Sequence, residues 1–234
     1  MSSHDQPVGD EPDRVWPIGT EITDLRAYFR DHQASLRRQV ARYYADSPPS
    51  LDPPGRRRST GYSGRWFDRL RLESPISSFA PVDFLAAEAL SVQLPPHAVA
   101  AILLTERDYF DGLLRQIPEA TALWEVAHDE LSPGAPLQQL YEALRTFDDV
   151  DAVKASKLLA LKRPALVPIY DRAVRTFLAP PRGGFWALVR EWLSDEVARD
   201  EIMEATSTAP SGVGLLRRLD VAIWMQVEHP EKDG

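Results

Sequence analysis

Apolar residues recur along most of the chain at the spacing of an amphipathic helix, and Pro and Gly residues interrupt the pattern. Between residues 20 and 45, Leu25, Phe29, Leu36 and Val40 follow one another at four- and seven-residue steps, which predicts one long first helix. Comparable patterns predict further helices over 81–92, 96–104, 105–117, 119–128, 136–147, 185–202 and 215–224.

No segment shows a sustained two-residue alternation, so the sequence predicts an all-α fold with a single multi-helix domain over residues 20–228. Residues 1–19 are polar and contain three prolines, which predicts a disordered N-terminal tail, and 229–234 are predicted to form a short C-terminal tail. Residues 47–64 are rich in Pro, Gly and Arg and are predicted to form a long basic loop. A loop of that length is usually functional or disordered.

Residues 148–178 are predicted to form a hairpin-like pair of helices joined by a short connector. Asp151 is a plausible N-cap for the first helix, on which Lys154 and Lys157 share one face. Pro164 and Pro168 keep the connector out of helical geometry, and Leu166, Val167 and Ile169 would anchor it in the core. Asp171 then occupies the N-cap position of the second helix, where aspartate is favoured for structural reasons alone.

The formal net charge of −8 argues against indiscriminate binding of polyanions. Basic residues are nevertheless concentrated in two islands, 56–73 and 152–182, within an otherwise acidic chain. Two such islands form a localised anion site if they meet in space, and otherwise they are unrelated solvated faces. Both interpretations remain open at this point.

Composition excludes several kinds of site. The chain has no cysteine, which excludes disulfides, thiolate zinc sites and cysteine nucleophiles. Its five histidines are scattered without metal-ligand spacing, and no phosphate-binding loop, dinucleotide fingerprint or nucleophile-elbow serine is present. We therefore expect no metal and no cofactor. No apolar run is long enough to span a membrane, so a cytoplasmic protein without membrane contact is the default expectation.

The run Val150–Phe177 resembles the core of the helix-hairpin-helix DNA glycosylases, in which a hairpin precedes a lysine-bearing helix and a hydrophobic connector ends in aspartate. The resemblance implies that Asp171 corresponds to the catalytic aspartate, which stabilises a cationic sugar or activates water. It also implies that Lys154 lies near the Schiff-base lysine of lyase-competent members, with Lys157 as a less well-registered substitute. The glycosylase hairpin carries two glycines, whereas this chain has Asp149-Val150-Asp151, whose carboxylates would repel a phosphate.

The whole chain is also similar to an uncharacterised bacterial family of unknown function, a resemblance that implies no activity. It is carried by the runs Tyr62–Phe67, Ala155–Pro164 and Leu215–Asp220.

Two hypotheses follow from these observations. In the first, the chain binds DNA or another phosphate-bearing ligand on a glycosylase-like scaffold that is catalytically active or degenerate, with Asp171 and Lys154 as the catalytic candidates. Its proposed binding residues share a positive charge and are Lys157, Lys162, Arg163, Arg172, Arg175 and Arg65. In the second, a non-enzymatic helical module binds a protein partner or a small anion, and Asp171 only caps a helix.

Overall fold

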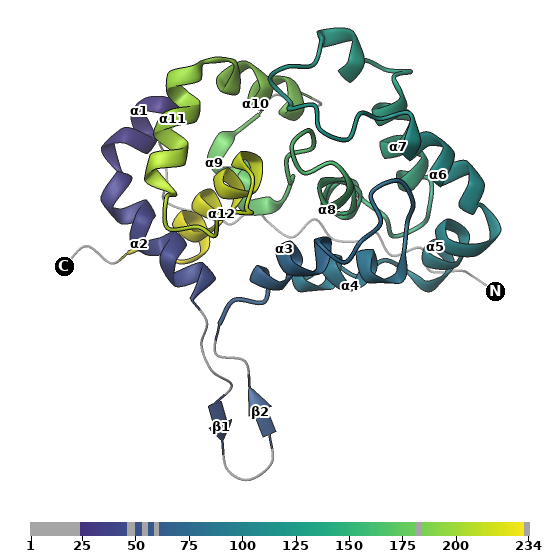
Figure 1. Cartoon of the computed structure of the whole chain (residues 1–234), viewed down its shortest axis with the longest axis horizontal. Helices are drawn as coiled ribbons and strands as arrows, with labels where there is room; N and C mark the ends of the chain where they lie inside the picture. The colour runs from purple at the N-terminus through teal and green to yellow at the C-terminus, as the bar shows by residue number, and fades with distance from the viewer. Residues whose placement is uncertain (1–23, 46–49, 53–55, 59–60, 181–183, 232–234) are drawn as a thin grey trace, which may run out of the picture.

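Short helices make up most of the computed structural model, which describes residues 24–45, 50–52, 56–58, 61–180 and 184–231 (Figure 1). The α-helices are α1 (Leu25–Asp31), α2 (Gln33–Tyr44), α3 (Arg65–Arg71), α4 (Pro81–Ala89), α5 (Pro96–Ala100), α6 (Arg107–Arg115), α7 (Pro136–Arg145), α8 (Ala152–Lys162), α9 (Arg172–Leu178), α10 (Phe185–Ser194), α11 (Glu196–Ala205) and α12 (Leu215–Glu228). A π-helical turn, Ala101–Thr105, follows α5, and a 3₁₀ turn, His128–Leu131, precedes α7.

The helices form two groups that meet along a seam (Figure 1). The first and last parts of the chain build one group, in which α12 packs against α2 and α9, and α11 packs against α1. The middle of the chain builds the other group, in which α3 and α4 pack against each other and α8 packs against α4 and α7. Buried apolar residues of both groups belong to one continuous core, so the all-α prediction for a single domain is confirmed.

Helix α12 is the most deeply buried long helix of the first group. Val221, Ala222, Ile223 and Met225 are all fully or almost fully buried, as its nearly continuous apolar sequence predicts. The same helix also buries charged residues near its N-terminus, including Arg217 and Asp220. Buried charges need partners, so this end of α12 is where the core becomes polar.

Two predicted long helices are each interrupted by one residue. The helix predicted over 20–45 divides at His32, whose backbone N–H closes α1 by donating to Tyr28 O at 3.1 Å. The helix predicted over 185–202 divides at Asp195, whose carboxylate accepts from Val197 N at 2.9 Å and caps α11. At Asp195 a local side-chain cap thus overrides an apolar pattern that continues on both sides of the break, whereas α2 begins after His32 without a side-chain cap.

The helix predicted over 119–128 is wrong. This segment is built from turns, and its backbone bonds to another part of the chain, because Leu123 N donates to Ala165 O at 2.9 Å. Apolar residues of the segment, such as Leu123 and Val126, are buried as a helix would have buried them. These residues therefore belong to the core without forming a helix.

The predicted loop over 47–64 contains a short antiparallel pair of strands, β1 (Ser50–Asp52) and β2 (Arg56–Arg58), with Ser50 opposite Arg58. Three consecutive arginines show no apolar–polar alternation, which explains why the sequence pattern did not indicate a strand. The predicted C-terminal tail is also partly attached, because Glu231 pairs with Arg38 of α2 at 2.6 Å. The predicted disordered tail, 1–19, lies outside the described residues.

No helix in the described part of the chain is both long enough and apolar enough to cross a lipid bilayer.

Candidate functional site

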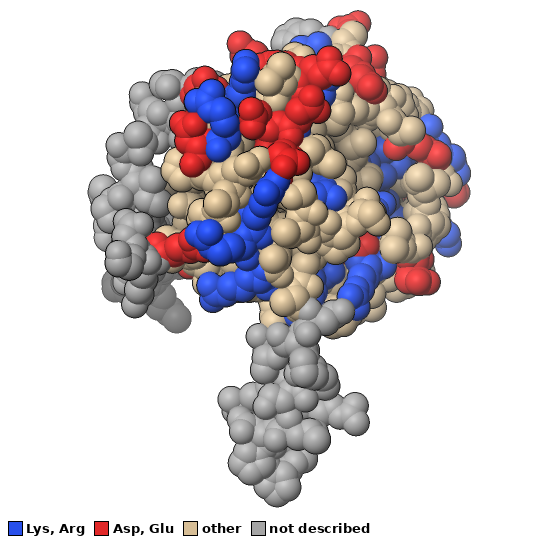
Figure 2. Space-filling model, turned by 60° about the vertical axis from the view of Figure 1, so that its left-hand side comes forward, with Lys and Arg blue, Asp and Glu red and all other residues tan. Residues whose placement is uncertain are grey.

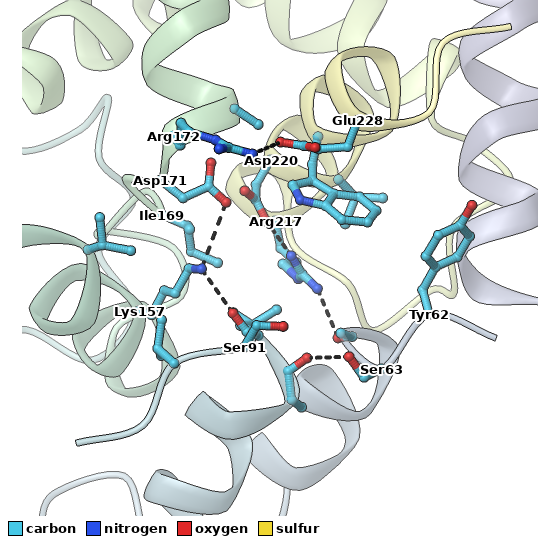
Figure 3. Close-up of a pocket in the computed structure, with 18 of the residues that line it drawn as sticks. Tyr62, Ser63, Ser91, Lys157, Ile169, Asp171, Arg172, Arg217, Asp220 and Glu228 are labelled. Atoms are coloured by element: carbon cyan, nitrogen blue, oxygen red, sulfur yellow. Dashed lines mark hydrogen bonds and ion pairs between the residues drawn. The ribbon is translucent and has the colours of Figure 1, made fainter. Parts of the chain in front are cut away.

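A cavity of about 350 Å³ opens at the seam between the two groups of helices (Figure 3). Its lining residues come from the end of α2, the turn before α3, the end of α4, the first half of α8, the start of α9 and one face of α12. The charged residues among them are Lys157, Asp171, Arg172, Arg217, Asp220 and Glu228. We call this space the seam cavity.

Helix α8 and the connector behind it hold Asp171 at the cavity. Asp151 caps α8 by accepting from Lys154 N at 2.9 Å, as predicted. The buried hydroxyl of Ser156 then accepts from Tyr170 N at 3.1 Å and lies 3.3 Å from Tyr170 O. This contact ties α8 to the residue immediately before Asp171.

Asp171 caps α9 and lines the seam cavity at the same time. Its Oδ1 accepts from Val174 N at 3.0 Å, so the predicted N-cap is confirmed. Its Oδ2 lies 3.9 Å from Nζ of Lys157, close enough for an ion pair but too far for a hydrogen bond (Figure 3). The capping role therefore uses one carboxylate oxygen and leaves the other facing the cavity.

The lysine beside Asp171 is Lys157, held in place by the end of α4. Its Nζ donates to Leu90 O at 3.0 Å. That carbonyl is available because Ser91, with a φ of 60°, turns the chain sharply after α4, and Ser91 N and Val92 N satisfy earlier carbonyls of the helix. A left-handed conformation is unfavourable for a residue with a side chain, so this turn stores some strain beside the cavity.

Arg217 is the hub of a buried polar network on the α12 side. Its guanidinium pairs with Asp220 and lies 3.2 Å from Asp68 Oδ2. It also donates to Tyr43 OH at 2.7 Å and to Gly64 O at 2.9 Å. The network therefore connects α12 with α2, α3 and the turn between them.

Asp220 is only 5% exposed, and its Oδ1 has no hydrogen-bond partner among the described residues. Burial raises the pKa of its carboxyl group to about 7, although Arg217 acts in the opposite direction and Asp171 raises the pKa further. A buried acceptor without a partner is costly, and native structures contain few of them. Asp220 lines the seam cavity, so this unpartnered oxygen belongs to a residue of the cavity wall.

Aromatic side chains form one wall of the seam cavity. The rings of Tyr43 and Tyr62 are stacked with centroids 5.4 Å apart, and Trp224 meets Tyr62 edge-on at 5.5 Å. The guanidinium of Arg217 lies over the Tyr43 ring at 5.4 Å, and that of Arg42 lies over Tyr62 at 5.8 Å. Two of these rings therefore already contact a guanidinium group of the protein.

The structure brings three of the sequence-derived candidates to one site. Asp171, Lys157 and Arg172 all line the seam cavity, and Arg172 pairs with Glu228 at 3.2 Å. Lys154, the catalytic lysine implied by the glycosylase resemblance, does not line it. Its Nζ instead bonds to the side chain of Asp149 at 2.9 Å, in the hairpin that departs from the glycine pattern.

Three other basic candidates are internal supports and are not available at the surface. Lys162 pairs with Asp83 and donates to Ser78 O at 2.8 Å. Arg163 is fully buried, and its guanidinium donates to backbone carbonyls such as Ile117 O at 3.0 Å. Arg65 is also buried, and its guanidinium donates to Ala45 O at 2.9 Å.

The basic surface that the sequence predicts therefore has fewer exposed members than expected. Arg175 is exposed on α9, but it does not line the seam cavity. Figure 2 shows acidic and basic side chains side by side on the face formed by α1, α2 and α11, not a single basic field. Within the described residues, no group of three or more His, Asp or Glu side chains is arranged to hold a metal ion.

Sequence reasoning missed Arg217 and Asp220. A signal was present, because two arginines and an aspartate interrupt an otherwise apolar helix in the run Leu215–Asp220. Charges at core-facing positions of such a helix must be paired or functional. The family resemblance that this run carries implies no role for either residue.

A protein-family model matches most of the chain. A model described as a family of unknown function, DUF6308, matches residues 22–227. No match was found among curated proteins or among solved structures. The resemblance to helix-hairpin-helix DNA glycosylases therefore stays a prediction, whereas the resemblance to an uncharacterised family is supported. Because the match spans most of its length, the chain belongs to the DUF6308 family of unknown function.

Proposed function

We propose that this protein binds a small polar molecule in the seam cavity. The observation that carries the proposal is the buried carboxyl group of Asp220, which lines the same cavity as Lys157 and Asp171 and whose Oδ1 has no hydrogen-bond partner among the described residues. A volume of about 350 Å³ falls within the usual range for small-molecule sites. A ligand N–H that reaches this oxygen would remove the cost of a buried acceptor without a hydrogen bond.

The combination of side chains also suits a small ligand. Such sites generally pair an apolar or aromatic wall with a few fixed polar groups. Here the wall is made by Tyr62 and Trp224, and the polar groups are held by helix caps and by the Arg217 network. Fixed groups of this kind orient a ligand without large rearrangement.

The proposal favours the second of the two sequence-based hypotheses, with one change. Asp171 acts as a helix cap, but its second oxygen also faces the cavity, so capping and ligand binding are compatible. The ligand need not be an anion, because Asp171, Asp220 and Glu228 balance the three basic residues of the lining. No catalytic step is required of Asp171 in this proposal.

The test is ligand-observed NMR on the full chain with a set of small ring compounds, comprising benzamidine, benzamide, benzoate, uracil and nicotinamide. We expect at least one of them to bind. Val153→Trp, which places a large ring at the cavity wall, should abolish that binding, whereas Val197→Trp on exposed α11 should not. Absence of binding by every compound, or equal binding to both variants, would overturn the proposal.

Nucleic-acid binding is the second candidate, and one observation favours it. An amine and a carboxylate, Lys157 and Asp171, lie 3.9 Å apart at the end of the connector, close to the arrangement that the glycosylase resemblance implies. The readout is fluorescence anisotropy with a labelled duplex containing an abasic site. The affinity should fall steeply as the salt concentration rises. Arg175→Ala should reduce the slope of log affinity against log salt concentration by about one unit, which corresponds to one released counterion. No binding at low salt would remove this candidate.

A further inference from the structure

We infer that the seam cavity selects a small organic cation whose N–H groups pair with Asp220 and Asp171. This inference rests on the proposed function and adds the chemical class of the ligand. It follows from which polar groups in the cavity already have partners, from the position of the two carboxylates, and from the aromatic wall.

Two of the three basic groups of the cavity, Arg217 and Arg172, are occupied by side-chain partners, and the third, Lys157, donates to Leu90 O at 3.0 Å. Arg217 has four acceptors, namely Asp68, Asp220, Tyr43 OH and Gly64 O. Arg172 pairs with Glu228 at 3.2 Å. An anionic ligand would have to displace these contacts before it gained any of its own.

The acidic groups keep free bonding capacity. Asp220 Oδ1 has no partner within the described part of the chain. The Oδ2 of Asp171 forms one ion pair within the described residues, with Lys157 at 3.9 Å, which is beyond hydrogen-bonding distance. Figure 3 shows both side chains at the same opening, with Lys157 between α8 and the end of α4. The open positions therefore call for hydrogen-bond donors, and donors that carry positive charge make the stronger bonds to carboxylates.

The aromatic wall favours the same class of ligand. Tyr62 and Trp224 line the cavity, and ring faces attract ammonium and guanidinium groups. Arg217 and Arg42 already lie over the rings of Tyr43 and Tyr62, so this cluster accommodates cations in the protein itself. A flat cation could contact a ring with one face while its edge donates to the carboxylates.

Three probes of nearly equal shape test whether the cavity prefers a cationic, a neutral or an anionic ligand. Benzamidine is a cation with four N–H donors, benzamide is neutral, and benzoate is an anion, so their affinities report charge preference at almost constant size. Isothermal titration calorimetry with the full chain should show benzamidine binding at least about tenfold more tightly than benzamide, a difference of about 1.4 kcal/mol. Benzoate should bind most weakly.

Asp220→Asn provides the residue-level test, because it keeps the shape of the side chain and removes its charge. It should weaken benzamidine by about tenfold or more and leave benzamide within about twofold. Asp200→Asn, which makes the same change of charge on exposed α11, should leave both affinities unaltered. The folded state of each variant is checked by thermal unfolding.

The possible outcomes separate the two levels of inference. If benzoate or benzamide binds as tightly as benzamidine, and Val153→Trp still removes the binding, the charge preference is wrong and the proposed function stands. If benzamidine binds but Asp220→Asn does not weaken it, the pairing with Asp220 is wrong. If none of the three compounds binds, the inference fails, and the proposed function fails with it when uracil and nicotinamide also do not bind.

Discussion

At the scale of single residues, the carboxyl group of Asp220 is buried, and burial disfavours its charged form. Burial raises the pKa of its carboxyl group to about 7, with Asp171 adding to the effect and Arg217 and Lys157 opposing it. In an unfolded chain the same group titrates near pH ~4. Between these pH values the folded chain binds more protons than the unfolded chain, so the contribution of Asp220 to stability is largest at low pH and declines as pH rises.

We therefore predict that Asp220→Asn removes part of the pH dependence of stability. The wild-type free energy of unfolding should lose about 1.4 kcal/mol per pH unit from this group between pH ~4 and ~7, and the Asn variant should lack that component. Urea denaturation at several pH values measures the difference. Asp200→Asn, an exposed control on α11, should follow the wild-type curve. Parallel curves for wild type and Asp220→Asn would show that the carboxyl group is not strained by burial.

At the scale of elements, the contact between α8 and its connector fixes the position of Asp171. The buried Ser156 hydroxyl accepts from Tyr170 N at 3.1 Å, one residue before the cap of α9. Loss of a partner for a buried backbone N–H costs about 1–3 kcal/mol. The same loss would free the connector to move, so it should affect the cavity as well as stability.

Ser156→Ala should lower the free energy of unfolding by about 1–3 kcal/mol and speed hydrogen exchange at the Tyr170 amide. Ser194→Ala is the matched control, because Ser194 bonds to a carbonyl of its own helix, Arg190 O, at an exposed position. That control should change stability by no more than about 0.5 kcal/mol. A loss of stability without faster exchange at Tyr170 would mean that the hydroxyl supports α8 only.

The sequence predicts where most helices begin better than where long helices break. Pro81, Pro96 and Pro136 begin helices as expected, because proline has a helical φ and needs no partner for a backbone N–H in the first turn. Asp151 and Asp171 cap helices as expected. The breaks at His32 and Asp195 were missed because the helices on both sides bury their apolar faces in the same core, so the apolar spacing hardly changes across the break.

At the scale of the whole molecule, the sequence predicts only those residues of the candidate site that lie close together along the chain. Lys157 and Asp171 lie fourteen residues apart in one motif, and both were identified. Arg217 and Asp220 reach the same cavity from the far end of the chain, through tertiary packing that no local pattern encodes. Conversely, Lys162 and Arg163 belong to a basic island in sequence but turn inward, where Lys162 contacts Ser78 O and Arg163 contacts Ile117 O.

Arg217 joins the two groups of helices across the seam, and its removal should destabilise the whole fold. Its partners lie on α2, α3, α12 and the turn before α3, and loss of a buried charge leaves Asp68 and Asp220 without their main counter-ion. Breaking a buried pair on one side typically costs about 3–5 kcal/mol. Arg217→Met should therefore lower the Tm by about 6–20 °C, whereas Arg175→Ala on the surface of α9 should change it little.

The double variant Arg217→Met with Asp220→Asn tests whether this cost comes from the stranded carboxylates. If it does, the second substitution should recover part of the lost stability, because it removes one of the two carboxylates that Arg217 neutralises. Thermal and urea unfolding of the four proteins in this cycle give the coupling energy directly. Additive effects of the two substitutions would mean that Arg217 acts mainly through Tyr43 and Gly64, as a packing and hydrogen-bonding link between α2 and α12, and not through charge.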